Sequence, residues 1–95
     1  MEISISANKA IITGNIKSVS DYQNIKSTID NLTSQHKSIT IDIKDSISIT
    51  SSTIGYFNKL VLKDKIDLQM NIGNAQLLDL LEDLNLASIF KAIKA

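Results

Sequence analysis

The 95-residue chain contains no cysteine and no proline, and it has only three glycines. Without cysteine, neither a disulfide framework nor a cysteine-ligated metal site can form. The lack of proline and the scarcity of glycine argue against a flexible linker. We therefore expect one domain, residues 1–95, with a single hydrophobic core.

The chain also contains no arginine and no tryptophan, and its formal net charge is zero. Nucleic-acid-binding proteins carry a basic excess and read phosphates and bases with arginine and aromatic side chains, so we expect no nucleic-acid partner. No apolar run is long enough to cross a bilayer, and the first residues lack the basic start and apolar stretch of a signal peptide. These absences favour a cytoplasmic protein without direct membrane insertion.

Isoleucines alternate with polar residues in several segments, and this period of two is typical of strands with one buried face. We expect strands over residues 3–6, 10–16, 39–44 and 66–73. The first two are joined by a tight turn at residues 7–9, where Asn8 tolerates a left-handed backbone.

Apolar residues spaced by three and four predict the helices. The first begins at Ser20 or Asp21, either being a plausible N-cap, and the second covers residues 54–61. A third contains a leucine stripe at positions 77, 80, 81 and 84, which we expect to be buried, and a short closing helix spans residues 86–93.

This order predicts an antiparallel hairpin followed by parallel strands with right-handed helical crossovers. Strands covered on both faces read as continuous apolar runs, whereas these strands alternate with polar residues. The helices should therefore cover one face only. The expected fold class is α/β, a two-layer sandwich with a mixed β-sheet and its helices on one face.

Four consecutive hydroxyl residues, Thr50 to Thr53, stand where the strand around Ile43 gives way to the second helix. Serine and threonine are favoured helix N-caps, so capping alone can explain them. The unpaired N–H groups and the dipole of a helix start also attract anions. A phosphate on one of these hydroxyls would be stabilised there and would change the surface that a partner meets.

The segment from Ile49 to Gly55, the tail Asn71 to Leu86 with Phe90, and the Gly14-Asn15-Ile16 segment together resemble the STAS domain. This fold occurs in sulphate transporter tails and in bacterial anti-sigma factor antagonists. The family has Ile-Asp-Ser-Ser-Gly-Leu-Gly at the helix start, so Thr50 takes the place of the family's Asp and Thr53 that of its first Gly.

The resemblance to the antagonist branch implies a signalling protein of transcription regulation. Its implied partner is an anti-sigma factor that is also a serine kinase, with a PP2C-type phosphatase as a second partner. The matched phosphorylation site is Ser52, and the candidate partner-contact residues are Thr50, Ser51, Thr53 and Ile54. Ile54 could instead be the first core position of its helix.

Other functions have less support in the sequence. Nucleophilic catalysis by Ser52 needs a nearby base, but the only histidine, His36, should lie at the other end of the strand, so we expect no enzyme and no catalytic residues. No cluster has metal-ligand spacing, so we expect no metal or cofactor. An accessory subunit or scaffold of a membrane transport complex, never phosphorylated, is the main alternative. A small-ligand site near the helix start would lack both a glycine-rich loop and arginine.

Overall fold

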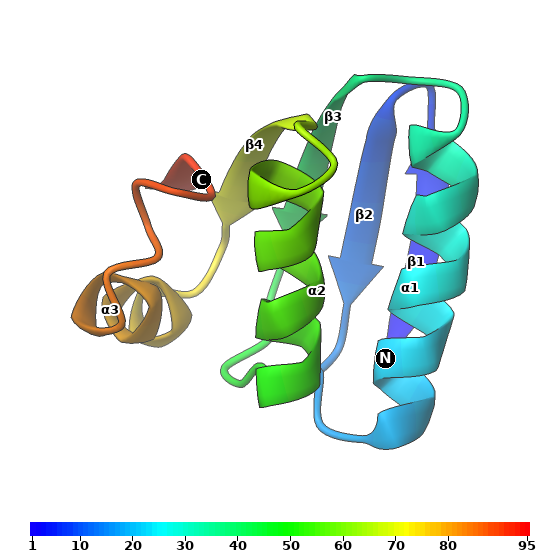
Figure 1. The fold of residues 1–95 in the computed structure, drawn as a ribbon. Coiled ribbons are helices and arrows are strands. Elements are labelled where there is room, and N and C mark those ends of the chain that lie inside the picture. Colours follow the sequence, from blue (N-terminus) through cyan, green and yellow to red (C-terminus); the bar gives the residue numbers. More distant parts are fainter.

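The computed structural model describes all residues, 1–95, and contains five strands and three helices (Figure 1). In chain order these elements are β1 (Glu2–Ser6), β2 (Lys9–Thr13), α1 (Val19–Thr33), β3 (Ser38–Ile43), α2 (Ser51–Leu62), β4 (Asp67–Ile72), α3 (Ala75–Asp83) and β5 (Ala92–Lys94). None of the three helices has the length and hydrophobicity needed to span a bilayer.

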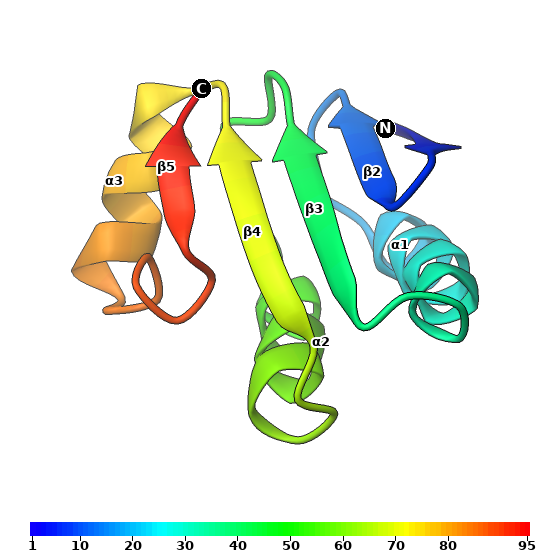
Figure 2. The same ribbon diagram turned by 90° about the horizontal axis from the view of Figure 1, so that it is seen from above.

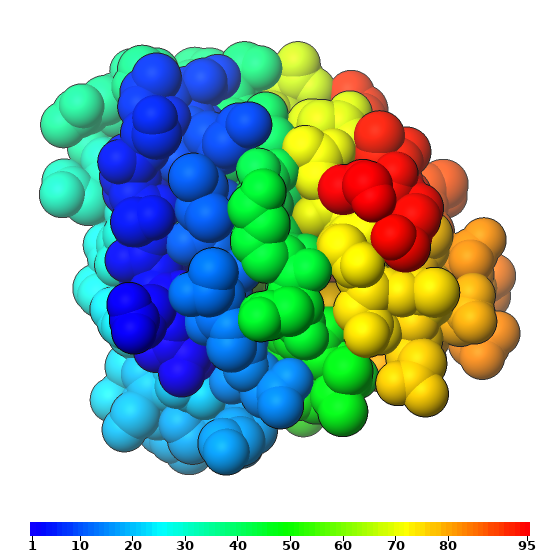
Figure 3. All heavy atoms as spheres, turned by 180° about the vertical axis from the view of Figure 1, so that it is seen from behind, coloured from blue at the N-terminus to red at the C-terminus, as the bar shows by residue number.

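The strands form one mixed sheet in the order β1-β2-β3-β4-β5 (Figure 2). β1 pairs antiparallel with β2, and every other neighbouring pair is parallel. The helices α1 and α2 lie against one face of the sheet, and α3 lies beside β5. No helix covers the opposite face, which Figure 3 presents to the viewer. The expected α/β two-layer sandwich is confirmed.

The core lies between the sheet and its helices and is built mainly from isoleucine and leucine. Ile12, Ile41 and Met70 from three adjacent strands are fully buried. Phe57 of α2 meets Phe90 edge-on, with ring centroids 5.9 Å apart. This aromatic contact joins the second helix to the C-terminal segment.

The C-terminal segment differs from the prediction. The expected closing helix is only a turn, in which the Phe90 N–H donates to the Leu86 carbonyl, and β5 follows as an additional edge strand. Lys91 has a φ of 51°, a left-handed conformation that ends any helix. The α3 stripe is also only partly as expected, because Leu77 and Leu81 are buried whereas Leu80 and Leu84 are exposed.

Two turns at the start of the chain also differ in detail. Ala7, not Asn8, takes the left-handed conformation of the hairpin, with a φ of 54°. The N-cap of α1 is Ser18 rather than Ser20 or Asp21. Ser18 and Asp21 form a capping box, in which the carboxylate at the third helical position bonds back to the cap residue.

Candidate functional site

The predicted hydroxyl cluster lies at the start of α2, on the side of the molecule where the parallel strands have their C-terminal ends (Figure 1). Thr50 is the N-cap: its backbone is extended, and its hydroxyl accepts the Thr53 N–H at 3.3 Å. The two threonine hydroxyls also lie 2.8 Å apart and hydrogen-bond to each other. The side chains of Thr50 and Thr53 therefore cap the start of α2 together.

Ser51 and Ser52 occupy the first two helical positions, and both are exposed. Neither backbone N–H donates to an acceptor within the chain, as expected for the first turn of a helix. The first turn contains no acidic residue. Two hydroxyls therefore face solvent at a helix end whose partial positive charge is not offset by a carboxylate of its own first turn.

The loop that leads to this helix start, residues 44–50, is braced by the buried side chain of Ser46. The Ser46 hydroxyl accepts the Ile16 N–H at 3.0 Å and donates to the Ser48 carbonyl at 2.6 Å. In return, the Ser48 hydroxyl donates to the Ile16 carbonyl at 3.0 Å. These bonds join the loop before α2 to the loop before α1, and they fix where α2 begins.

Two further bonds between the same loops complete the brace. The Ile47 N–H donates to the Asn15 side-chain carbonyl at 3.0 Å, and the Gly14 N–H donates to the Asp45 carboxylate at 2.7 Å. Sequence reasoning did not identify this role of Asn15, Asp45 or Ser46. The only sequence signal was the composition of the connection between β3 and α2, which has no proline and no glycine but several short polar residues. The backbone N–H and C=O groups of such an ordered loop need hydrogen-bond partners, and short polar side chains can supply them.

Two large apolar side chains are exposed near the start of α2. Ile47, on the loop before α2, is 54% exposed, and Val19, the first residue of α1, is 69% exposed. Large aliphatic side chains with this exposure can be buried by a partner. They stand at the same end of the molecule as Ser51 and Ser52, so a partner could contact both at once.

A contact between α1 and α2 fixes the orientation of the second helix. The Tyr56 hydroxyl donates to the Asp30 carboxylate at 2.6 Å, and the Lys26 ammonium pairs with the same group at 2.9 Å. Burial raises the pKa of Asp30, but the bonds from Tyr56 and Lys26 outweigh that effect and leave the pKa below its usual value. Burial, together with the bond to Asp30, raises the pKa of Tyr56 far above its ordinary range.

The predicted contact residues differ in accessibility. Ser51 is exposed as expected, whereas Thr53 is fully buried and Thr50 is half-buried. The expectation that Thr53 lines an accessible surface is therefore wrong: the third helical position turns inward, where its hydroxyl bonds to Thr50. Ile54 is half-buried and packs against the core.

The glycine of α2, Gly55, does not mark close packing of the helix against the sheet. Gly55 is exposed, and a Cβ built there would meet no atom within 4 Å. The close approach occurs at Gly73 instead, where a Cβ would overlap the Lys44 carbonyl.

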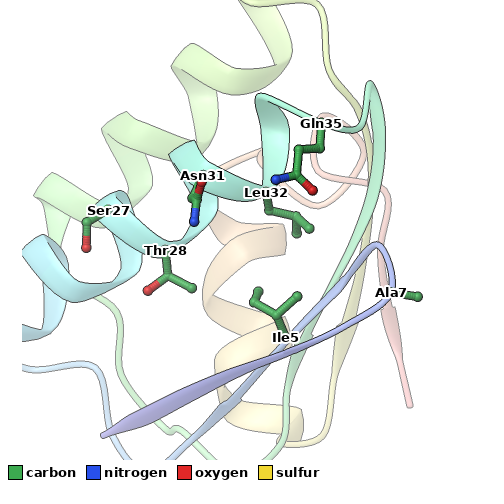
Figure 4. Close-up of a pocket in the computed structure, with 7 residues that line it drawn as sticks. All are labelled: Ile5, Ala7, Ser27, Thr28, Asn31, Leu32 and Gln35. Atoms are coloured by element: carbon green, nitrogen blue, oxygen red, sulfur yellow. The ribbon is translucent and has the colours of Figure 1, made fainter.

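The candidate base and a surface pocket beside β1 lie away from the hydroxyl cluster. His36 precedes β3 and Ser52 follows it, so they stand at opposite ends of this strand, as expected. A cavity of about 440 Å³ lies between β1 and the C-terminal half of α1 (Figure 4), whereas Ser52 lies in the first turn of α2. The structure contains no group of three side chains placed to hold a metal ion.

Comparison with known proteins identifies a structural neighbour but no family. No protein-family model and no curated protein matches the sequence. The chain resembles the NMR structure of a protein named TM1081, with a TM-score of 0.68 and 17% sequence identity. The match covers 98% of this chain and 79% of that chain. At this identity the likeness concerns the fold alone.

Proposed function

We propose that this chain is a STAS-like binding module of the anti-sigma factor antagonist kind, without catalytic activity of its own. In its unphosphorylated form it binds an anti-sigma factor with serine kinase activity in the cytoplasm, and phosphate at Ser52 releases that partner. The observation that carries the proposal is the pair of exposed serine hydroxyls on the first turn of α2, at the same end of the molecule as the exposed side chains of Ile47 and Val19. The resemblance of residues 49–55 to the family signature selects Ser52 from this pair.

The electrostatics at the start of α2 are compatible with such a switch. A phosphate adds a charge of about −1.5 to −2 at neutral pH. Within the domain, this charge would lie near unpaired N–H groups and the positive end of the helix dipole. A partner surface fitted to a neutral hydroxyl would instead lose a contact and face a new negative charge.

Accessibility favours the serines over the threonines as the phosphate acceptor. A kinase must reach the hydroxyl oxygen, and Thr53 is fully buried. Thr50 is half-buried, and its oxygen already bonds to the Thr53 N–H and hydroxyl. Ser51 and Ser52 have exposed side chains and no such bonds.

The test uses two matched aspartate variants. Ser52→Asp should abolish binding to an anti-sigma serine kinase from the source organism, measured by calorimetry, whereas Ser51→Asp should retain it. Ser52→Ala should bind and should receive no phosphate from that kinase when its intact mass is measured. Native affinity in the Ser52→Asp variant would refute the switch.

The Thr50–Thr53 pair supports a second candidate, the unphosphorylated accessory subunit of a membrane transport complex. Thr50 supplies a neutral hydroxyl where the family has a carboxylate, and that hydroxyl is already engaged by Thr53. This candidate predicts co-purification with a transporter or its ATPase. It also predicts an intact mass without phosphate for the protein isolated from native cells.

A further inference from the structure

The two edges of the sheet differ in length and charge. At one edge, β5 has only three residues, and Lys91 and Lys94 stand at its two ends. At the other edge, β1 has five residues, and no charged residue occurs from Ile3 to Asn8. Short strands and lysines are common devices that prevent an edge from pairing, and β1 has neither.

The unpaired backbone groups of β1 can be assigned from the ladder. The carbonyls of Asn8 and Ile12 accept from Thr40 and Lys44, so alternate residues of β2 point toward β3. The remaining residues of β2 point toward β1, where their partners are Glu2, Ser4 and Ser6. The N–H and C=O groups of Ile3 and Ile5 therefore point outward, where no strand pairs with them.

A cavity adjoins this unpaired edge on the helix side of the sheet. Ile5, which is 43% exposed, and the buried Leu32 provide its apolar surface. Ser27, Thr28 and Asn31 of α1 and Gln35 of the turn after it line its other wall, and none of these side chains is charged. Figure 4 shows the α1 side chains facing the strand across the opening. A strand laid along β1 would place an apolar side chain between Ile5 and Leu32.

The position of α1 determines what kind of strand fits. Seen from the open face of the sheet, α1 projects beyond β1 at this edge (Figure 3). A second copy paired through its own β1 would bring its own α1 against this helix. A single extended segment without a helix of its own avoids that conflict.

Charged side chains near the two ends of β1 indicate which charges such a segment should carry. Glu2 is exposed at one end. At the other end, Lys9 lies opposite Ser6 in the hairpin; its ammonium pairs with Asp42 at 3.5 Å, and its side chain remains 44% exposed. Both charges point to the open face, because residues two apart in a strand share a face and Ser6 lies opposite Lys9.

We propose that β1 and α1 form a groove that binds an extended peptide segment of a partner protein, antiparallel to β1. Four hydrogen bonds join the segment to the outward groups of Ile3 and Ile5. The segment reads acidic–apolar–any–apolar–basic: its acidic residue lies opposite Ser6, near Lys9, and its basic residue lies opposite Glu2. The groove is separate from the Ser52 site and does not depend on the proposed function.

The first test uses two synthetic peptides with the full chain. The probe Ser-Glu-Ile-Ser-Ile-Lys-Ser carries the predicted pattern, and the control Ser-Lys-Ile-Ser-Ile-Glu-Ser exchanges its charges. In ¹⁵N NMR titrations the probe should shift Ile3, Ile5, Thr28 and Leu32 but leave Ser51 and Ser52 unmoved. The control should bind roughly fivefold more weakly, because its glutamate lies directly opposite Glu2 and forms a cross-strand pair of like charge.

The second test changes the edge itself. Ile5→Pro removes one outward N–H and leaves the hydrogen bonds to β2 intact, as proline permits on an edge strand. This variant should lose peptide binding at an unchanged melting temperature, while Ile5→Val should bind like the native chain. Equal binding of both peptides, shifts outside the groove, or native affinity in Ile5→Pro would each overturn the proposal. Protection of the Ile3 and Ile5 amides by self-association alone would also overturn it, in favour of a second copy.

Discussion

The two long helices begin in chemically different ways. At the start of α1, the Ser18 hydroxyl accepts the Asp21 N–H at 3.1 Å, and the Asp21 carboxylate accepts from Lys17 and Ser18 at 3.0 and 3.2 Å. At the start of α2, the neutral hydroxyls of Thr50 and Thr53 bond to each other, and no carboxylate is present in the first turn. One helix start thus holds its own negative charge, and the other holds none.

This difference indicates which helix start can accept an added anion. The positive end of α1 is already balanced by Asp21, so a second negative charge there would meet a like charge. The positive end of α2 is balanced by no such residue, and two exposed serines stand on it.

The largest effect should come from the residue that supports both helix starts, Ser46. Ser46→Ala leaves the Ile16 N–H without its acceptor in a buried site, and removal of one partner of a buried bond costs about 1–3 kcal/mol. Urea denaturation should show this loss. Ser48→Ala, which removes a bond to a partner that is less buried, should cost less, and an equal loss in both variants would contradict the assigned brace.

Removal of each N-cap should have an intermediate effect. Ser18→Ala and Thr50→Ala should each lower the free energy of unfolding by about 1 kcal/mol, the usual cost of losing an N-cap side chain. Thr50→Ala also deprives the buried Thr53 hydroxyl of its partner, so its loss should be the larger of the two. Thr50→Ser, which keeps the capping oxygen, should unfold close to the native midpoint.

Much of the fold could be predicted because its signals are local. Strands β1 to β4 follow alternating apolar residues, and α1 and α2 follow apolar steps of three and four. The prediction failed at the C-terminus, where Leu86 and Phe90 have helical spacing although only one turn forms. A left-handed Lys91 and the pairing of β5 with β4 decide that segment, and both depend on contacts distant in sequence.

The candidate site was predictable only in outline. The hydroxyl cluster, its place at a strand-to-helix junction and its distance from His36 follow from the order of the elements. The inward turn of Thr53 and the buried position of Ser46 do not, because serine and threonine suit buried and exposed sites alike when their hydroxyls find partners. Only the neighbouring loop around Asn15 and Ile16 determines which hydroxyls find them.

Aspartate substitution at the second position of each helix should change the stability of the domain by a smaller amount, and by more at α2 than at α1. Ser52→Asp places a carboxylate at the second position of α2 and should stabilise the domain by about 0.3–1 kcal/mol at low ionic strength. Ser20→Asp places one at the second position of α1, beside Asp21, and should stabilise it less. Thermal melts in low and high salt measure this difference. An equal gain at both positions would show that α2 is no more receptive to negative charge than α1.

The smallest expected effect is a loss of stability at acidic pH, and it should arise at the start of α1 but not at the start of α2. The hydrogen bond from the Lys17 N–H, helped by those with Ser18, holds the pKa of Asp21 below its usual value. A lowered pKa means that the folded state favours the charged carboxylate, so its contribution is present above the pKa of the unfolded chain and is lost as the pH falls through the lowered value. The stability difference between the native chain and Asp21→Asn should therefore shrink across this acidic range. The stability difference between the native chain and Thr50→Ala should stay constant over the same range, because the cap of α2 contains no titrating group. Urea midpoints measured at several acidic pH values test both expectations. A Thr50→Ala difference that shrank in parallel with the Asp21→Asn difference would contradict the assignment of the effect to Asp21.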